Sequence, residues 1–180
     1  MQYKMFMPQS EWVCPESFPD LKGYKEVCID LETYDPGLLQ KGPGWATNDG
    51  HIIGIAVAVE GNQWYFPIRH ENGGNLDAKR ALGWLKEVVS TDRIYVFHNA
   101  SYDVGWLLTE NIEVKGKIVD TMIVGALLDE NRFSYSLNAL GKDYLGERKQ
   151  ENELREAAAE FGVNPKSEMY KLPAQYVGLY

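Results

Sequence analysis

Three strand-like segments, separated by turn residues, constrain the fold of this chain more than any other feature. Residues 25–33 are apolar up to a polar end, and residues 51–60 (H-I-I-G-I-A-V-A-V-E) are apolar on both faces. Gly61-Asn62 then marks a tight turn, and residues 63–69 (Q-W-Y-F-P-I-R) form the third segment. This order predicts an antiparallel three-stranded meander at one edge of a β-sheet.

Strands and helices alternate in the rest of the chain. Residues 76–89 have apolar side chains at helical spacing, and Asn75 is the predicted N-cap of this helix. Residues 93–98 and 115–120 are predicted as two further short strands. The other predicted helices cover residues 99–111, 121–128, 136–145 and 151–161. The fold class that fits is α/β: a mixed sheet, antiparallel in its meander and parallel elsewhere, with helices on both faces.

The composition predicts one soluble globular domain. Of the 180 residues, 44% are hydrophobic and 24% are charged, and no apolar run is long enough to cross a bilayer. Residues 1–23 contain three prolines and no periodicity, so we expect an N-terminal leader or loosely attached arm before a domain at 24–180. The two cysteines, Cys14 and Cys28, have no metal-binding spacing, and Cys28 is expected inside a buried strand. A reduced, cytoplasmic protein without a membrane partner is the simplest interpretation.

The net charge limits how this protein could meet nucleic acid. The formal net charge of −8 argues against a protein that coats duplex DNA through a broad basic face. Nucleic acid remains open as a substrate, because divalent cations neutralise an acidic site locally. A few lysine and arginine side chains suffice to hold a short strand end.

Two carboxylates close the first strand, V-C-I-D-L-E-T-Y (27–34). Asp30 and Glu32 are one residue apart, so their side chains point to the same face of the strand. Like charges at this spacing repel, and one of the two pKa values would normally be raised. A cation shared between the two carboxylates removes this repulsion.

A third carboxylate, Asp103, follows the fourth predicted strand. Asn99 and Asp103 are four residues apart in H-N-A-S-Y-D, so they lie on one side of a first helical turn. If the first and fourth strands are neighbours, Asp103 converges with Asp30 and Glu32 at the carboxyl ends of the strands. Hard divalent cations favour such an oxygen-only set of ligands.

Several nearby residues also have a purely structural interpretation. Capping of its helix is favoured over catalysis for Asn99, and Asp120 is predicted to cap the helix that follows it. His98 is interpreted as a core or rim histidine rather than a ligand. Tyr102 and Trp106 could stack on a base, but their helical spacing favours core packing.

The motifs D-L-E-T, N-A-S-Y-D and Y-V-G-L-Y together resemble the three exonuclease motifs of the DnaQ-like (DEDD) 3′–5′ exonucleases. The resemblance covers roughly residue 24 to the last residue. It is greatest to the tyrosine subclass, in the proofreading domain of family A DNA polymerases, particularly those encoded by phages. It implies a ribonuclease H-like fold and a site with two divalent ions, Mg²⁺ or Mn²⁺.

The resemblance also implies roles for individual residues. Asp30 resembles the aspartate that bridges both ions, Glu32 the glutamate on the ion that activates water, and Asp103 the aspartate that supports the second ion. Tyr180 resembles the tyrosine that positions the attacking water. The fourth carboxylate of the motif is expected four residues after Tyr180, past the end of this sequence. A chain cut at that point is expected to be weakly active or inactive.

The motif neighbours Leu31, Thr33, Asn99 and Tyr102 are predicted to bind the substrate. The implied activity is hydrolysis of the terminal phosphodiester of single-stranded DNA, with release of nucleoside 5′-monophosphates. The expected partners are a 3′ DNA end and a polymerase domain downstream in the parent chain, with a monomer in the cytoplasm of a bacterium or phage-infected host. Two alternatives stay open: a ribonuclease D-like enzyme that acts on RNA ends, and a catalytically degenerate scaffold or single-strand-binding module.

Overall fold

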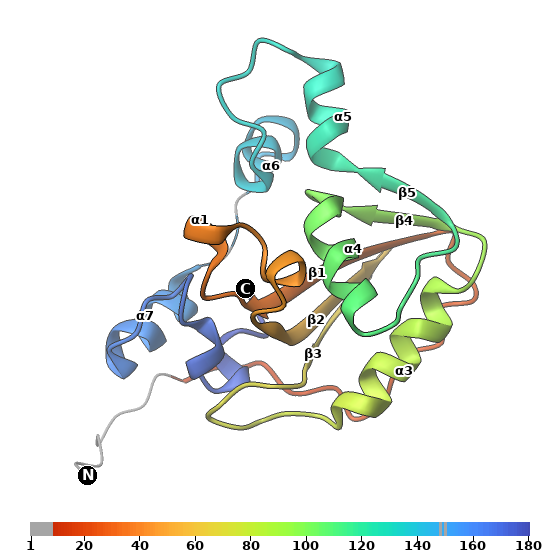
Figure 1. Cartoon of the computed structure of the whole chain (residues 1–180). Helices are drawn as coiled ribbons and strands as arrows, with labels where there is room; N and C mark the ends of the chain where they lie inside the picture. The colour runs from red at the N-terminus through yellow and green to blue at the C-terminus, as the bar shows by residue number, and fades with distance from the viewer. Residues whose placement is uncertain (1–8, 148, 150) are drawn as a thin grey trace.

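A five-stranded mixed sheet forms the centre of the molecule (Figure 1). The computed structural model describes residues 9–147, 149 and 151–180. The strands are β1 (Glu26–Tyr34), β2 (His51–Val59), β3 (Asn62–Pro67), β4 (Ile94–Phe97) and β5 (Lys117–Asp120), in the spatial order β3-β2-β1-β4-β5. The pairs β1–β2 and β2–β3 are antiparallel, whereas β1–β4 and β4–β5 are parallel. The predicted α/β class, with a meander joined to parallel strands, is confirmed.

The helices lie close to the ranges predicted from the sequence. Each predicted helix is present, with ends within two residues of the prediction: α3 (Ala78–Val89), α4 (Ala100–Thr109), α5 (Thr121–Leu128), α6 (Leu137–Leu145) and α7 (Asn152–Phe161). The loop after β1 adds two single turns, α1 (Leu38–Lys41) and α2 (Gly44–Thr47). Two short 3₁₀ helices, η1 (Met169–Lys171) and η2 (Ala174–Tyr176), lead to the C-terminus.

The predicted N-cap of α3 was wrong by two residues. Asp77, not Asn75, accepts a hydrogen bond from the backbone N–H of Arg80 at 2.8 Å. Asn75 is engaged in the preceding loop, where its Oδ1 and Nδ2 each lie 2.7 Å from a backbone atom of His70. Both residue types are good caps, so composition alone could not choose between them.

The two faces of β1 have different environments. Val27, Ile29 and Leu31 are buried in the larger core, where they meet side chains of α3 and α4. The alternate residues, Cys28 among them, face the other way, and Cys28 is exposed. The expectation that Cys28 is buried was wrong, because only one face of this part of β1 is covered by helices.

A second core lies on the opposite face of the sheet. Its buried members come from β3, α7 and the C-terminal segment: Tyr65, Leu154, Ala157, Ala158, Met169, Leu172, Tyr176 and Val177. It covers the β2–β3 side of that face and leaves the β1 side open. The sheet therefore has helices on both faces, but the second layer is incomplete.

The described part of the predicted N-terminal arm is packed onto the domain. Phe18 stacks on Trp84 of α3 with ring centroids 5.3 Å apart, and Trp84 Nε1 donates to the backbone oxygen of Pro19 at 3.1 Å. Leu21 has an exposed fraction of 3%. Residues 9–23 thus form part of the folded unit, whereas residues 1–8 lie outside the described residues.

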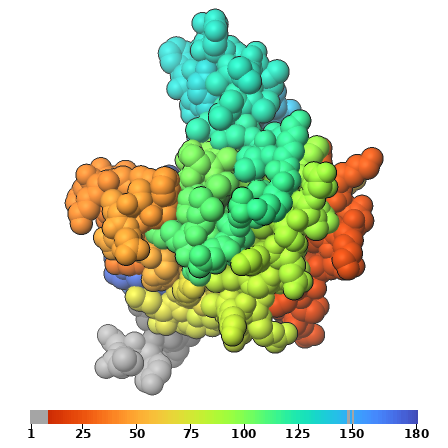
Figure 2. Space-filling model, turned by 45° about the vertical axis from the view of Figure 1, so that its right-hand side comes forward, coloured from red at the N-terminus to blue at the C-terminus, as the bar shows by residue number. Residues whose placement is uncertain are grey.

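Helices α5 and α6 stand out from the rest of the molecule, as the teal and cyan region of Figure 2 shows. Only Gly125 is buried in α5, and Leu127 has an exposed fraction of 82%. Within the described residues, none of the helices has both the length and the apolar character needed to span a bilayer.

Candidate functional site

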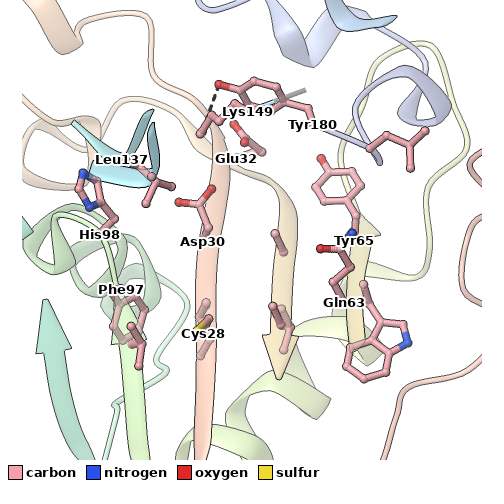
Figure 3. A pocket seen from close by; sticks show the side chains of 18 of the residues that line it. Cys28, Asp30, Glu32, Gln63, Tyr65, Phe97, His98, Leu137, Lys149 and Tyr180 are labelled. Carbon is pink, nitrogen blue, oxygen red and sulfur yellow. Dashed lines mark hydrogen bonds between the residues drawn. The ribbon is translucent and has the colours of Figure 1, made fainter. Parts of the chain in front are cut away.

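A cleft of about 600 Å³ opens on the uncovered face of β1. Asp30 and Glu32 point into it from the strand, as Figure 3 shows. His98 lies on one side of the cleft, Tyr65 on the other, and Tyr180 at the far end beyond Glu32. The shared orientation of the two carboxylates agrees with the alternation of side chains along β1.

The strand beside the carboxylates carries small residues. Asp30 pairs with Ala56 of β2, and Glu32 pairs with Gly54. At position 54 even a methyl group would not fit, because its carbon would lie 1.9 Å from the hydroxyl oxygen of Tyr65. The glycine at position 54 therefore leaves room for the Tyr65 hydroxyl.

The carboxylate pair carries poorly compensated negative charge. Burial raises the pKa of Asp30, while the positive charge of Lys149 opposes this shift. Burial and the charge of Asp30 together raise the pKa of Glu32 to about 7. Each carboxylate therefore resists ionisation, and a cation between them would favour the ionised form.

Lys149 and Tyr180 form a contact at the end of the cleft (Figure 3). Lys149 Nζ lies 3.3 Å from Tyr180 Oη and 4.4 Å from the centre of the tyrosine ring. Burial alone would lower the pKa of Lys149, but Tyr180 and Asp30 raise it overall. Burial raises the pKa of Tyr180, against the influence of Lys149.

Asp103 reaches β1 from α4, on the other side of the strand. Its exposed fraction is 2%, and its Oδ1 accepts a hydrogen bond from the backbone N–H of Leu31 at 2.9 Å. Burial, followed by the charge of Asp30, raises its pKa to about 8. Among the described residues, no three His, Cys, Asp or Glu side chains are grouped to hold a metal ion. The structure brings Asp30 and Glu32 together, but it does not bring Asp103 into one ligand group with them.

The available donors still fit a hard divalent cation. Asp30 and Glu32 offer only oxygen atoms and share one open face, and burial, with the charge of Asp30 on Glu32, raises their pKa values despite the nearby Lys149. Asp103 does not face the cleft, but it accepts a hydrogen bond from the backbone N–H of Leu31, the residue between the two carboxylates.

Three of the four residues predicted to bind substrate lie behind β1 rather than in the cleft. Leu31 is a core residue with an exposed fraction of 5%. Tyr102 Oη donates to the Asp35 carboxylate at 2.9 Å, so the Thr33 hydroxyl, 2.8 Å away, donates to Tyr102. These contacts brace β1 against α4, and none of the three predicted residues lines the cleft.

Asn99 is the N-cap residue of α4 but does not cap it with its side chain. Its backbone is left-handed, with a φ of 67°. Asp120 caps this helix instead, because its carboxylate accepts from the backbone N–H groups of Asn99 at 3.0 Å and Ala100 at 2.8 Å. It also accepts from Met122 N at 2.9 Å, which confirms Asp120 as the cap of α5. Capping by the Asn99 side chain was wrong: its Oδ1 accepts from the Ser101 hydroxyl at 3.3 Å and, among the described residues, from no backbone N–H of the helix.

Two cleft residues carried no distinguishing signal in the sequence. Tyr65 lies within an apolar strand, and Lys149 resembles any surface lysine in sequence. His98 was interpreted as a rim residue, and it does line the cleft, with Nδ1 2.9 Å from Thr121 Oγ1.

Comparison with known proteins assigns a chain with this fold and this acidic cleft to a family. The family model for the 3′–5′ exonuclease matches residues 15–175. The chain therefore belongs to the 3′–5′ exonuclease family.

Two curated relatives of this chain are phage DNA polymerases. A DNA-directed DNA polymerase of Pseudomonas phage M6 is 38% identical over 180 residues, which is 95% of this chain and 27% of the relative. DNA polymerase DpoZ of Salmonella phage PMBT28 is 34% identical over 147 residues, which is 81% of this chain and 21% of the relative. The chain thus spans about a quarter of the length of these relatives.

Solved structures share the fold at low sequence identity. Brucella melitensis NrnC with bound Mg²⁺ has a TM-score of 0.51 and 15% identity, over 73% of this chain and 59% of that chain. Pol1 from M. smegmatis has a TM-score of 0.51 and 13% identity, over 71% of this chain and 20% of that chain. The α/β fold of this chain is therefore also present in these two structures.

Proposed function

We propose that this chain is a proofreading domain that hydrolyses 3′-terminal phosphodiesters of single-stranded DNA and releases nucleoside 5′-monophosphates. The observation that carries the proposal is the carboxylate pair Asp30 and Glu32, which faces an open cleft on the central strand. Membership of the 3′–5′ exonuclease family supports the direction of hydrolysis.

Asp30 and Glu32 would hold the cations, two Mg²⁺ or Mn²⁺ ions by the pattern of the tyrosine subclass. When bound, such ions supply charge neutralisation and Lewis acidity to a phosphodiester. The donor chemistry of the pair supports this assignment, because both side chains offer only oxygen and their pKa values stay raised despite the charge of Lys149. Asp103 would act by fixing the backbone of Leu31 between them.

Tyr180 and Lys149 would act on the substrate from the far end of the cleft. The Tyr180 hydroxyl borders the same cleft as Glu32, a suitable position to orient an attacking water. Lys149 carries the positive charge nearest to this hydroxyl among the contacts of the described residues, and it could donate to a phosphate oxygen.

The shape and charge of the cleft favour a single strand over a duplex. The cleft of about 600 Å³ combines carboxylates with aromatic side chains on which the bases of an unpaired strand end could stack. Trp12, Trp64 and Leu137 in the wall offer apolar surface for bases. The net charge of −8 supplies no broad basic face for duplex DNA.

The relatives support a role beside a polymerase. They are DNA polymerases of which the chain spans about a quarter, so we propose that the domain receives primer ends from a polymerase domain of the same protein. It would act there as a monomer, in the cytoplasm of a bacterium or an infected host.

A degradation assay tests this proposal. DNA and RNA strands of one sequence, labelled at the 5′ end, are incubated with Mg²⁺ or Mn²⁺ and either this chain or the longer polymerase proposed to contain it. We expect the longer protein to shorten the DNA strand from its 3′ end, one nucleotide at a time, and the short chain to do so more slowly. Faster shortening of RNA would favour the ribonuclease D-like alternative, and intact strands of both kinds would favour the scaffold.

A further inference from the structure

Tyr65 and His70 form a buried hydrogen-bonded pair at the wall of the cleft. Their exposed fractions are 4% and 3%. Tyr65 Oη lies 2.7 Å from His70 Nε2, and His70 Nδ1 lies 3.0 Å from the backbone oxygen of Leu172. A buried polar chain stabilises a single arrangement only when each member has a partner, and here each has one.

The partners fix where the protons lie. The Leu172 carbonyl can only accept, so His70 Nδ1 carries a hydrogen and donates it. Burial lowers the pKa of His70 to about 4, so the ring is neutral at pH 7 and Nε2 is an acceptor. Tyr65 therefore donates to Nε2, and this bond holds His70 in the tautomer that can reach Leu172.

Gly54 of β2 leaves the space that the Tyr65 hydroxyl occupies. Gly54 pairs with Glu32 across β1 and β2, and a methyl carbon at position 54 would lie 1.9 Å from Tyr65 Oη. The glycine thus allows the tyrosine to lie over the residue opposite Glu32. Tyr65 therefore lies beside the residue that pairs with Glu32, while its partner His70 contacts the C-terminal segment at Leu172.

The loop that begins at His70 holds the C-terminal segment along several residues. Glu71 N donates to the Tyr170 oxygen at 2.9 Å, and Ala174 N donates to the Gly73 oxygen at 3.3 Å. The segment then continues through η2 to Tyr180. The hydrogen bond from His70 to Leu172 is fully buried, whereas the bond from the Asn72 side chain to Lys171 is exposed.

We propose that Tyr65 and His70 are positioning residues, which hold residues 169–180 on the sheet so that the Tyr180 hydroxyl stays at the carboxylate cleft. The catalytic consequence rests on the exonuclease activity proposed for this cleft. Displacement of a reacting or orienting group by about 1 Å can lower a rate about 100-fold, so a looser segment should slow the chemical step more than it weakens binding.

Three variants test the pair in the longer polymerase proposed to contain this chain, with kcat and KM for single-stranded DNA as one measurement. We expect His70→Leu to lower kcat about tenfold or more, with KM changed less than about twofold. His70→Asn should restore most of kcat, because its amide nitrogen can take the place of Nδ1 and donate to Leu172. Tyr65→Phe should lower kcat, because it frees His70 to adopt the tautomer that cannot donate to Leu172.

A second measurement does not depend on activity. Hydrogen exchange of residues 169–180 should become faster in His70→Leu and Tyr65→Phe, and should stay near wild type in His70→Asn. Tyr95→Phe is the matched control, since it removes another buried tyrosine hydroxyl, which donates to the Val88 oxygen in the other core. It should leave both kcat and the exchange of this segment unchanged.

The outcomes separate this inference from the proposed function. Cleavage by the wild type, with kcat and exchange unchanged in folded His70→Leu, would overturn the inference and leave the exonuclease standing. If the wild type does not cleave DNA, the exchange measurement alone decides: unchanged exchange overturns the holding role, and faster exchange supports it. If His70→Leu does not fold, Tyr65→Phe decides in the same way.

Discussion

The Asp103 side chain has two separate effects, a hydrogen bond to β1 and a buried acidic group whose ionisation is unfavourable. Its carboxyl group accepts a hydrogen bond from Leu31 N while burial and Asp30 disfavour its ionised form. The two effects can be separated by substitution, because asparagine keeps the acceptor and removes the charge.

We predict that, in EDTA at pH 8.5, Asp103→Asn is at least as stable as the wild type. Asp103→Ala should lose about 1–3 kcal/mol, because it leaves the buried Leu31 N–H without a partner. Urea unfolding of the two variants under the same conditions measures the difference. Equal destabilisation by both substitutions would show that the hydrogen bond to Leu31 does not matter.

Lys149 is predicted to stabilise the metal-free site through its charge. Replacement by methionine keeps the length of the side chain but removes the charge that opposes the raised pKa values of Asp30 and Glu32. We expect Lys149→Met to lower the stability in EDTA at pH 8 by about 0.5–1 kcal/mol. Thermal unfolding measures this loss, which should shrink when Mn²⁺ is added. Lys142→Met, on the exposed side of α6, is the control; an equal effect from both variants would contradict the role of Lys149.

At the scale of elements, Asp120 joins β5 to the starts of α4 and α5. It accepts hydrogen bonds from Asn99 N, Ala100 N and Met122 N, whereas Asp77 caps only α3. Burial alone would raise the pKa of Asp120, but these N–H groups hold it below its usual value. Such a group contributes stability above its unfolded pKa, and the contribution is lost as the pH falls.

We predict that Asp120→Ala destabilises the protein at pH 7 by about 2 kcal/mol or more, and Asp77→Ala by about 1 kcal/mol. The difference between Asp120→Ala and the wild type should decrease as the pH falls below the usual carboxyl value and through the lower folded-state pKa of Asp120. Denaturant unfolding of the three proteins at pH 7 and at several pH values below about 4 provides the test. A smaller effect for Asp120→Ala than for Asp77→Ala would refute the shared cap.

The elements themselves could be predicted from the sequence, because apolar periodicity and turn residues are local signals. Which face of an element is covered is not local. The run Val27-Cys28-Ile29 predicts a strand, but only the helices packed on the sheet decide that Cys28 is exposed. Asp103 was predicted near β1, yet its spacing could not show that it approaches from the other side. His70 and Leu172 are 102 residues apart, and no sequence pattern joins them.

At the scale of the whole molecule, the acidic site should make the metal-free protein sensitive to pH. The folded-state pKa values of Glu32 and Asp103 are raised, to about 7 and about 8. A raised folded-state pKa gives stability that is present below the unfolded value and is lost as the pH rises through the folded value. The window of this loss is therefore about pH 4 to pH 8.

We predict that the protein in EDTA is less stable at pH 8.5 than at pH 5, and that Mg²⁺ or Mn²⁺ restores stability at the higher pH. Melting temperatures across this range measure the effect, and Glu32→Gln should flatten the dependence. A stability that rises from pH 5 to pH 8.5 in EDTA would contradict the charge assignment at the cleft.

The most direct test of the central claim is the rate at which a 5′-labelled single strand is shortened, measured against Mg²⁺ concentration. The proteins are the longer polymerase proposed to contain this chain, its Asp30→Asn variant and the control Asp92→Asn, which changes an exposed acidic residue outside the cleft. We predict shortening from the 3′ end that needs Mg²⁺, falls at least about 100-fold in Asp30→Asn, and is unchanged in Asp92→Asn. A folded Asp30→Asn protein that shortens the strand at the wild-type rate would contradict the claim that this cleft is the hydrolytic site.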